Sequence, residues 1–258
     1  MPTVLITGAS SGLGTELAKL FAKDKHDIVL VARSENKLQA LANELHQLFG
    51  ITVTVIAKDL SIVTELDALY NEINAANIKI DFLVNNAGFG DYGLFAESDW
   101  NKQQEMINVN IIALTKLTHL FLPEMLKRKF GKILNIASTA AFQPGPTMSI
   151  YYATKSFVLH FSEAISNELE GTGITVTTLC PGAFESGFQA TAALEESRLV
   201  KGKKLPTSKD IAIFGYRHFL KGSRVCIPGL MNNIMASSIR FTPRGLVLKI
   251  VRYMQNKK

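Results

Sequence analysis

Short runs of β-branched and aliphatic residues alternate along this chain with longer segments of helical periodicity. This alternation favours a parallel sheet, because each parallel strand needs a long crossover to return to the same end of the sheet. We therefore predict an α/β fold in a single domain, with a doubly wound, seven-stranded parallel sheet and helices on both faces. The predicted strands are 3–7, 27–32, 52–57, 81–85, 132–137, 174–180 and 224–227.

The 258 residues contain no Pro-, Gly- or Ser-rich tract that would mark a linker, so residues 1–258 are predicted to be one domain. Cys180 and Cys226 lie far apart and lack metal-site spacing. We expect two ordinary buried thiols and no bound metal. Because the first strand is expected at Thr3 and no run of about 18 apolar residues occurs, we expect neither a signal peptide nor a membrane span. A cytoplasmic protein is the resulting prediction.

Positive charge is concentrated towards the C-terminus. The chain carries a net charge of +6, and residues 198–258 hold 14 Lys and Arg against Asp210 alone. This segment lacks stacking aromatics and zinc-finger spacing, so no nucleic-acid partner is expected. Residues 243–257 are predicted to form a basic amphipathic helix, and its docking on the more acidic body is favoured over contact with an anionic membrane. Residues 187–220 interrupt the alternation and are interpreted as an insertion on the substrate side.

A glycine-rich turn joins the first strand directly to a helix. Glycine permits a positive φ and lets the backbone approach a diphosphate, whose charge is favoured at a helix N-terminus. The turn therefore predicts a dinucleotide site in a Rossmann-like sheet. Its residues are Gly8, Ser10, Ser11, Gly12, Leu13 and Gly14.

The end of the second predicted strand indicates which dinucleotide binds. An acid at this position would bind the ribose hydroxyls of NAD, but the sequence reads Ala32-Arg33-Ser34. The Arg33 guanidinium can pair with a 2′-phosphate, and Ser34 can add a hydroxyl donor. The sequence therefore favours NADP(H).

Three further residues are candidates for proton-transfer chemistry. Tyr151 and Lys155 are four residues apart in a predicted helix, hence on one face. A neighbouring ammonium is expected to lower the pKa of the Tyr151 phenol and fit it for general acid or base catalysis. Ser138 ends the fifth strand, where its hydroxyl can hydrogen-bond a carbonyl oxygen that gains negative charge. Tyr152 is a rival phenol that we assign to packing.

Together these motifs resemble the short-chain dehydrogenase/reductase family. The shared features are the TGxxxGxG turn, Asn85-Asn86-Ala87-Gly88 as the family's NNAG, Pro181-Gly182, and the serine, tyrosine and lysine at family spacing. The resemblance covers nearly the whole chain. It adds cofactor contacts at Asp59, Leu60, Asn86, Ala87, Gly88, Tyr151, Lys155, Pro181, Gly182, Phe184 and Ser186. It also implies that Asn110 holds a water that relays protons to Lys155.

The resemblance implies an NADP(H)-dependent oxidoreductase that interconverts a carbonyl and an alcohol by hydride transfer. Tyr151 would act as general acid or base, Ser138 would orient the oxygen, and Lys155 would bind the nicotinamide ribose. Phe89, Phe142 and Phe188 favour an apolar small-molecule substrate. The helices near 100–125 and 151–169 are more apolar than sheet packing requires, and family members pair these helices. We therefore expect a homodimer or homotetramer.

Two other functions fit parts of the sequence. A non-catalytic NADP(H)-binding regulator would need the same turn, but the intact Ser138, Tyr151 and Lys155 argue against it. A sugar-nucleotide epimerase or dehydratase would be expected to carry TGxxGxxG, which differs from the spacing in this chain.

Overall fold

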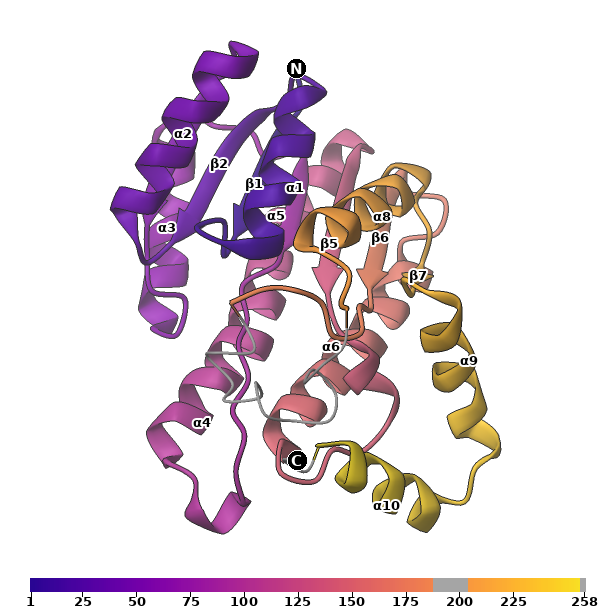
Figure 1. Ribbon diagram of the computed structural model, residues 1–258. Coiled ribbons are helices and arrows are strands. Elements are labelled where there is room, and N and C mark those ends of the chain that lie inside the picture. The colour runs from indigo at the N-terminus through magenta and orange to yellow at the C-terminus, as the bar shows by residue number, and fades with distance from the viewer. Residues whose placement is uncertain (188–203, 256–258) are drawn as a thin grey trace.

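The fold is organised around one parallel sheet, seen in a computed structural model that describes residues 1–187 and 204–255. Its seven strands are all parallel, in the order β3-β2-β1-β4-β5-β6-β7 (Figure 1). The strands are β1 (Thr3–Thr7), β2 (Asp27–Ala32), β3 (Val53–Ala57), β4 (Phe82–Asn85), β5 (Gly131–Ile136), β6 (Ile174–Leu179) and β7 (Val225–Cys226). All seven predicted strands are confirmed, and each boundary differs from its prediction by at most one residue. The order reverses between β1 and β4, where an open α/β sheet places its ligand site.

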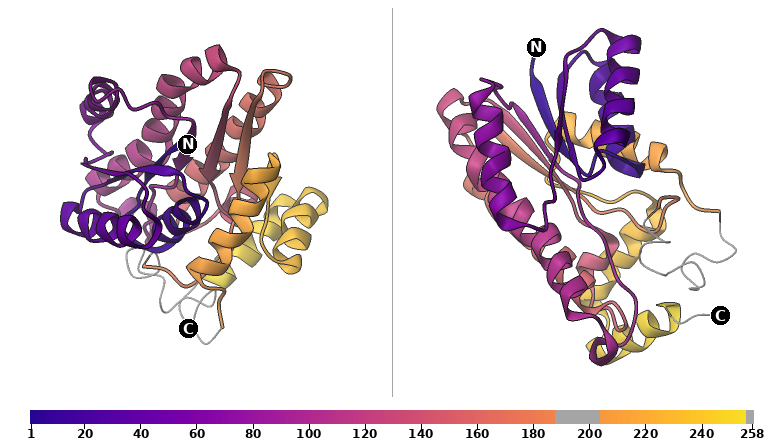
Figure 2. Two further views of the ribbon diagram at one scale, coloured as in Figure 1. Left: turned by 90° about the horizontal axis from the view of Figure 1, so that it is seen from above. Right: turned by 90° about the vertical axis from the view of Figure 1, so that its left-hand side faces the viewer.

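Helices cover both faces of the sheet (Figure 2). One face packs against α1 (Gly12–Lys23), α2 (Glu35–Phe49) and α8 (Ser208–Lys221). The other packs against α3 (Val63–Ala75), α5 (Leu114–Arg128) and α6 (Ser149–Glu168). Alternation along β1 explains how one strand serves both layers, since Val4 and Ile6 face the first layer and Leu5 faces the second.

A nearly continuous helical stretch crosses the second layer and extends below the sheet. It consists of α4 (Trp100–Ile107), the π-helical segment η2 (Asn108–Ala113) and α5. Within the described residues, this 29-residue stretch is the one helix long and apolar enough to cross a membrane by length and composition. Its α5 part packs Leu117, Phe121 and Met125 into the core, which accounts for its apolar character in a sheet-covering role.

The interpretation of residues 187–220 as a single insertion is wrong for its second half. Residues 188–203 lie outside the described part of the chain. Helix α8 belongs to the outer layer of the sheet, where Tyr216 and Phe219 join the core cluster. The Phe219 ring lies 5.4 Å from both the Phe21 and the Phe82 ring centroids. The missed signal is the apolar stripe of α8, which matches a sheet-packing helix.

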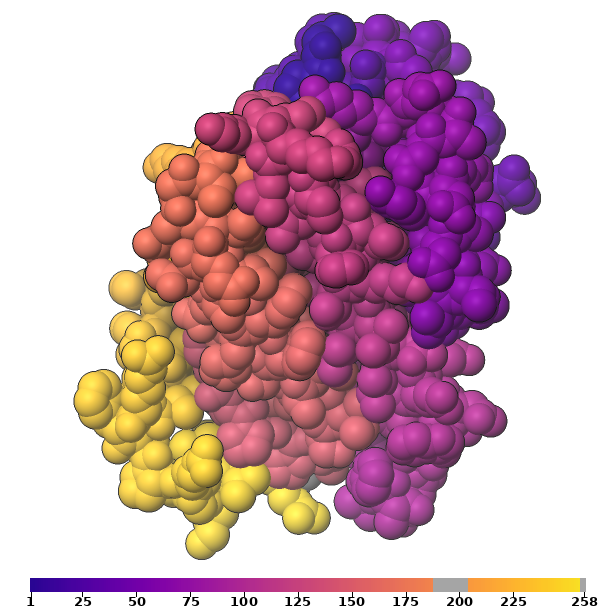
Figure 3. Space-filling view, turned by 180° about the vertical axis from the view of Figure 1, so that it is seen from behind, coloured from indigo at the N-terminus to yellow at the C-terminus, as the bar shows by residue number. Residues whose placement is uncertain are grey.

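The C-terminal part of the chain forms a lobe at one edge of the molecule, which we call the α9–α10 lobe (Figures 1 and 3). It comprises α9 (Leu230–Ser238), the 3₁₀ turn η4 (Ile239–Phe241) and α10 (Arg244–Gln255). The predicted C-terminal helix is confirmed in α10, and one side of it docks on the body through Val247, Val251 and Gln255, all buried. The other 3₁₀ turns in the described residues are η1 (Phe95–Glu97) and η3 (Thr139–Phe142).

Replacing Phe219 by alanine tests the place of α8 in the core. Removing this fully buried ring leaves a cavity between α1 and the sheet. We expect the free energy of unfolding to fall by about 3–5 kcal/mol in chemical denaturation. Leu220→Ala, at an exposed neighbouring position, should change it by less than about 0.5 kcal/mol. Equal small effects of the two variants would show that α8 is not a core helix.

Candidate functional site

Hydrogen bonds from Thr7 and Asn86 join the ends of β1 and β4 at the reversal in strand order. The Thr7 hydroxyl accepts from the backbone N–H groups of Asn86 and Ala87, each at 3.0 Å. The Asn86 amide donates to the carbonyl oxygens of Thr7 and Gly8, at 2.9 and 3.1 Å. These bonds hold the predicted NNAG segment against the glycine-rich turn.

The glycine-rich turn is shaped for close approach of a backbone-bound anion. Gly8 and Gly12 have φ values of 65° and 53°, which side-chain-bearing residues rarely adopt. At Gly14 an added Cβ would clash with the Gly8 carbonyl oxygen and lie 2.6 Å from the Asn86 amide nitrogen. The turn therefore requires glycine at all three positions.

Helix α1 begins at this turn, and its own residues do not offset the partial positive charge at its N-terminus. Ser11 is the N-cap residue but makes no side-chain capping bond, and the first turn contains no acid. The first backbone N–H groups and the positive end of the helix dipole thus remain available for an anion. The Ser11 side chain is exposed, Ser10 is half-buried, and Leu13 is buried in the core. This arrangement fits a dinucleotide diphosphate.

Arg33 lies beside the turn at the end of β2. Its side chain is 74% exposed, and its guanidinium lies 3.9 Å from the Asp59 carboxylate, at the end of β3. The Asp59 carboxylate also accepts hydrogen bonds from the backbone and hydroxyl of Ser61, at 2.9 and 2.7 Å. Ser34 caps α2 without a side-chain bond. An exposed arginine held only at the edge of salt-bridge distance can reorient towards a phosphate.

A small hollow lies on the other side of the NNAG segment. Leu60 and Ala87 line it together with Val109, from the π-helical segment. The family resemblance predicts cofactor contacts at Leu60 and Ala87, and the fold brings these two residues together.

Ser138, Tyr151 and Lys155 converge at the ends of β5 and α6. Tyr151 hydrogen-bonds with the Ser138 side chain. The Ser138 hydroxyl also lies 3.3 Å from the Pro181 carbonyl oxygen, to which it donates. Lys155 is 6% exposed, donates to the Ile136 carbonyl oxygen at 2.9 Å and lies 5.8 Å from the Tyr151 ring centroid. All three predicted side chains therefore share one buried cluster.

Burial controls the proton affinity of this cluster. It raises the pKa of Tyr151 well above its usual value, and the bond with Ser138 opposes this shift. It lowers the pKa of Lys155 to about 8, so the ammonium form still predominates at pH 7. The expectation that Lys155 would bring the phenol pKa below its usual value is therefore wrong for this structure. Loss of hydration on burial is the main cause of the raised pKa of Tyr151, and the neighbouring Tyr152 adds to it.

Asn110 connects the cluster to the NNAG segment. Its amide accepts from the Phe89 N–H at 3.1 Å and donates to the Phe89 carbonyl at 3.0 Å. It also donates to the Thr154 hydroxyl at 3.0 Å. A Cβ on Gly88 would lie 2.9 Å from the Asn110 carbonyl oxygen and 3.4 Å from the Lys155 ammonium. Glycine at 88 thus keeps the space between these two groups free.

The π-helical segment that carries Asn110 is itself a local irregularity of a type frequent at functional sites. It extends from Asn108 to Ala113 and buries the Asn110 side chain. Asn108 donates from its side-chain amide to the Ser61 carbonyl oxygen at 2.9 Å. The segment therefore links the cluster of Ser138, Tyr151 and Lys155 to the loop after β3.

The Pro181-Gly182 segment follows β6 at the same end of the sheet. The Pro181 carbonyl oxygen also accepts from the Thr139 N–H at 2.9 Å. A Cβ on Gly182 would lie 2.8 Å from the Asn232 amide nitrogen, so α9 packs closely here. Phe184 packs against the core, and the Ser186 Cβ lies 3.8 Å from where a Gly12 Cβ would stand. The chain after β6 therefore returns to the glycine-rich turn.

Tyr151 also belongs to an apolar cluster. It includes Tyr152 and Met148 of the α6 region and Val247 and Val251 of α10, with Phe89 packed against it. Tyr152 hydrogen-bonds with Gln255, and burial raises the pKa of Tyr152 to about 12. The assignment of Tyr152 to packing agrees with this position.

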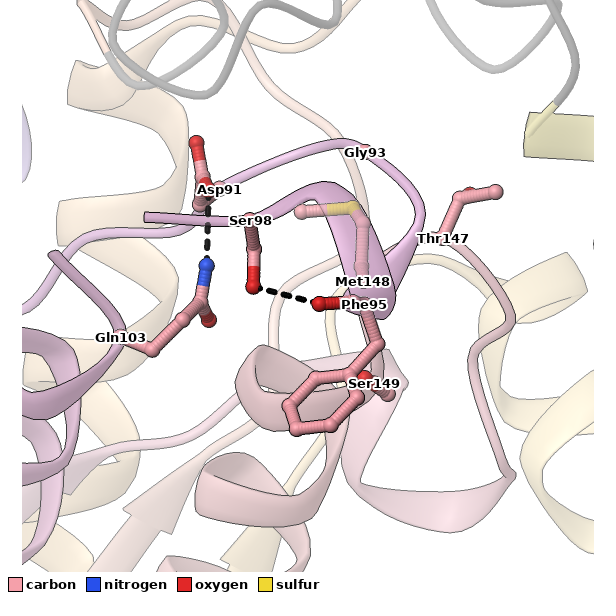
Figure 4. Close-up of a pocket in the computed structure, with 8 residues that line it drawn as sticks. All are labelled: Asp91, Gly93, Phe95, Ser98, Gln103, Thr147, Met148 and Ser149. Carbon is pink, nitrogen blue, oxygen red and sulfur yellow. Dashed lines mark hydrogen bonds between the residues drawn. The ribbon is translucent and has the colours of Figure 1, made fainter. Parts of the chain in front are cut away.

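A small polar pocket lies next to this apolar cluster (Figure 4). Met148 lines both. Across the pocket, the Gln103 amide points to Asp91 and donates to its carboxylate at 2.8 Å. Ser98 donates to the Phe95 carbonyl oxygen at 2.8 Å, which holds the neighbouring loop.

Sequence reasoning missed three contributors to the site. Thr7 fixes the β1–β4 turn, Thr154 supports Asn110, and α10 supplies Val247 and Val251 beside Tyr151. Thr154 lies between Tyr151 and Lys155, so a search for polar residues on that helix face could have found it. Nothing local in the sequence places α10 against α6.

The sequence of this chain is similar to those of known dehydrogenases and reductases. The family model for short chain dehydrogenase matches residues 2–197. The ketoacyl reductase HetN of Nostoc sp. is 37% identical over 180 residues, covering 70% of this chain and 62% of HetN. The very-long-chain 3-oxoacyl-CoA reductase of Mus musculus is 30% identical over 272 residues, covering 98% of this chain and 82% of that protein.

A solved structure extends the similarity to the fold. The short-chain dehydrogenase from Sphingobium yanoikuyae in complex with NADPH superposes with a TM-score of 0.85 at 33% identity, covering 95% of each chain. The alignment with HetN spans less than two thirds of that relative. The sequence match over residues 2–197 and the shared fold agree that this chain belongs to the short-chain dehydrogenase/reductase family of oxidoreductases.

Proposed function

We propose that this protein is an NADPH-dependent reductase of ketones that carry apolar groups, with Tyr151 as the proton donor. The observation that carries the proposal is the buried cluster of Ser138, Tyr151 and Lys155, placed at the same end of the sheet as the uncapped glycine-rich turn. One site can thus hold a dinucleotide and move a proton at a carbonyl oxygen.

The cofactor preference rests on charge at the end of β2. Arg33 is exposed there, and β2 ends at Ala32 without an acid at that end to bind a ribose diol. The structural neighbour from Sphingobium yanoikuyae was solved with NADPH, which supports the same preference. Asp59, close to Arg33, would lose this partner when the guanidinium turns to a 2′-phosphate.

The residues divide the reaction between them. When bound, NADPH supplies the hydride that the carbonyl carbon accepts. The Ser138 hydroxyl hydrogen-bonds the carbonyl oxygen, and Tyr151 donates the proton that completes the alcohol. The raised pKa of Tyr151 keeps its hydroxyl protonated at neutral pH, which is the state required in the reductive direction. Asn110 would hold a water that relays protons to Lys155, and Lys155 would in turn return a proton to Tyr151 after each turnover.

The substrate class follows from the surroundings of Tyr151. Its neighbours in the apolar cluster, among them Phe89, Val247 and Val251, favour a substrate with an apolar group next to the carbonyl. Two relatives are named as reductases of ketoacyl and very-long-chain 3-oxoacyl-CoA compounds. An acyl or similarly apolar ketone is therefore the first substrate class to test.

Oligomeric state and location complete the proposal. Exposed apolar residues remain on the outer helices, including Ile112 in η2 and Phe157 in α6, and favour a homodimer or homotetramer. Phe157 stacks on Phe161 with ring centroids 5.8 Å apart, which forms a flat apolar surface. Both cysteines of the chain are free, in keeping with a reducing, cytoplasmic location.

The proposal is tested by mixing the purified protein with a panel of ketones and either NADPH or NADH while following the absorbance of the reduced nicotinamide. Oxidation of NADPH with apolar ketones, and formation of the alcohol, are expected. NADPH binding without turnover of any ketone would instead indicate a non-catalytic regulator.

Tyr151→Phe should lower kcat by at least about a hundredfold, because it removes the proton donor and little packing. NADPH binding, followed by the fluorescence of the reduced nicotinamide, should change little. Tyr152→Phe is the matched control, since it removes a buried phenol from the adjacent position, and it should retain most activity. Similar losses in both variants would contradict the role of Tyr151.

Arg33→Ala should raise KM for NADPH about ten- to hundredfold and leave KM for NADH nearly unchanged. A charge-assisted hydrogen bond to the 2′-phosphate is worth about 1.5–3 kcal/mol. Lys58→Ala is the control, because Lys58 is a nearby cation that pairs with Glu72. An equal effect of Arg33→Ala on the two cofactors would refute the assignment.

Light scattering at micromolar concentration should give the mass of a dimer or tetramer. Phe157→Asp should lower that mass, because an unpaired carboxylate in an apolar interface is costly. Leu48→Asp alters a more exposed apolar residue on α2 and should leave the mass unchanged. A monomeric wild-type protein would rule out the oligomer.

A further inference from the structure

The outward surface of the α9–α10 lobe is apolar although the lobe is already docked. Docking uses Val247, Val251 and Gln255 of α10. On the other side of α10, Leu246, Ile250 and Tyr253 recur at i, i+4 and i+7 and are 49%, 46% and 64% exposed. The sequence-based expectation of docking on the body therefore accounts for only one face of this helix.

Helix α9 and the turn after it extend the same exposed surface. Leu230 and Met231 are 78% and 67% exposed, Ile234 is 52% exposed, and Phe241 is 89% exposed. Phe241 belongs to η4, the turn joining α9 to α10, which lies at the periphery of the molecule away from the sheet (Figure 1). Single exposed apolar residues are ordinary, but seven of them on two short helices and the turn between them indicate an interaction surface.

The charge of the lobe is of one sign. Residues 225–255 contain Arg240, Arg244, Lys249 and Arg252, and no Asp or Glu. All four cations are exposed in the described structure. Lys249 and Arg252 border the exposed stripe of α10, and Arg240 and Arg244 flank the turn that carries Phe241. The surface thus combines an apolar centre with a basic rim.

We infer that this surface binds the headgroup region of an anionic lipid bilayer. Aliphatic and aromatic side chains would enter the interface, and the long basic side chains would reach the phosphate groups. Each basic residue near an anionic surface strengthens binding by about fivefold. The inference concerns binding alone and does not depend on the proposed reaction.

The same charges disfavour a second copy of the chain as the occupant. A symmetric contact places one patch against its equivalent, so the four cations of each copy would face those of the other. Apolar attraction between copies would then oppose electrostatic repulsion, whereas an anionic bilayer satisfies both features of the surface. The opposite face of α10 touches the cluster around Tyr151, so lipid contact would place the catalytic residues near the bilayer.

The test uses full-length protein and sedimentation with vesicles of phosphatidylcholine, alone or mixed with phosphatidylglycerol. The protein should bind the mixed vesicles at least about tenfold more strongly than phosphatidylcholine alone. Binding should weaken as sodium chloride is added, because salt screens the charges. No binding to the mixed vesicles at physiological ionic strength would overturn the inference.

Two double variants locate the surface. Phe241→Ser with Leu246→Ser, and separately Arg240→Glu with Arg244→Glu, should each reduce vesicle binding at least about tenfold. Both alter exposed side chains, so melting temperature and molar mass should be unchanged. The matched controls are Leu48→Ser with Ile62→Ser and Lys37→Glu with Lys209→Glu, at exposed sites elsewhere, and they should bind as the wild type does.

Two outcomes of the variant experiment would refute the lipid surface. Equal losses in the lobe variants and their controls would show that vesicle binding is not specific to the lobe. A lower molar mass for Phe241→Ser with Leu246→Ser, with vesicle binding retained, would show that the surface joins copies of the chain.

Discussion

The hydrogen bonds of Thr7 and Asn86 at the reversal of strand order are the constraint on which the site depends. Helices on opposite faces of the sheet diverge from this point, so the strand ends leave room for a ligand. Asn86 fixes the carbonyl groups of Thr7 and Gly8, and the close approach at Gly14 leaves no room for a side chain there. A cofactor cradle of this kind is therefore set by the fold before any ligand arrives.

From the same junction, a chain of polar contacts reaches the proton-transfer cluster. Gly88 leaves space between Asn110 and Lys155, and Thr154 supports the Asn110 amide. Burial lowers the pKa of Lys155, because the charged ammonium loses its hydration. In the described structure the ammonium donates a hydrogen bond to the Ile136 carbonyl oxygen. A buried lysine is costly for stability, and this one lies 5.8 Å from the Tyr151 ring centroid. The fold thus holds a charged group in its interior, where the proposed proton transfer would use it.

The sequence was sufficient for features that arise from local chemistry. Strand positions followed from residue alternation, and the glycine-rich turn, Arg33 and the Tyr151–Lys155 spacing followed from what their side chains can do. Properties that arise from tertiary packing were not accessible in this way. The pKa of Tyr151 depends on how completely the surrounding elements exclude water, and the role of α8 depends on which sheet face was left uncovered. Likewise, periodicity predicted that α10 is amphipathic. It could not show that part of the apolar surface of α10 stays exposed after the helix docks on the body.

The central claim is that the cluster around Tyr151 reduces a carbonyl with hydride from NADPH. The most direct measurement uses NADPH deuterated at C4 on one face, a pool of apolar ketones, and mass spectrometry of the alcohols formed. One of the two C4-deuterated forms should transfer a single deuterium to the carbinol carbon of the product, and Tyr151→Phe should abolish this transfer. Alcohol formed without deuterium from either form, or unchanged transfer in Tyr151→Phe, would contradict it.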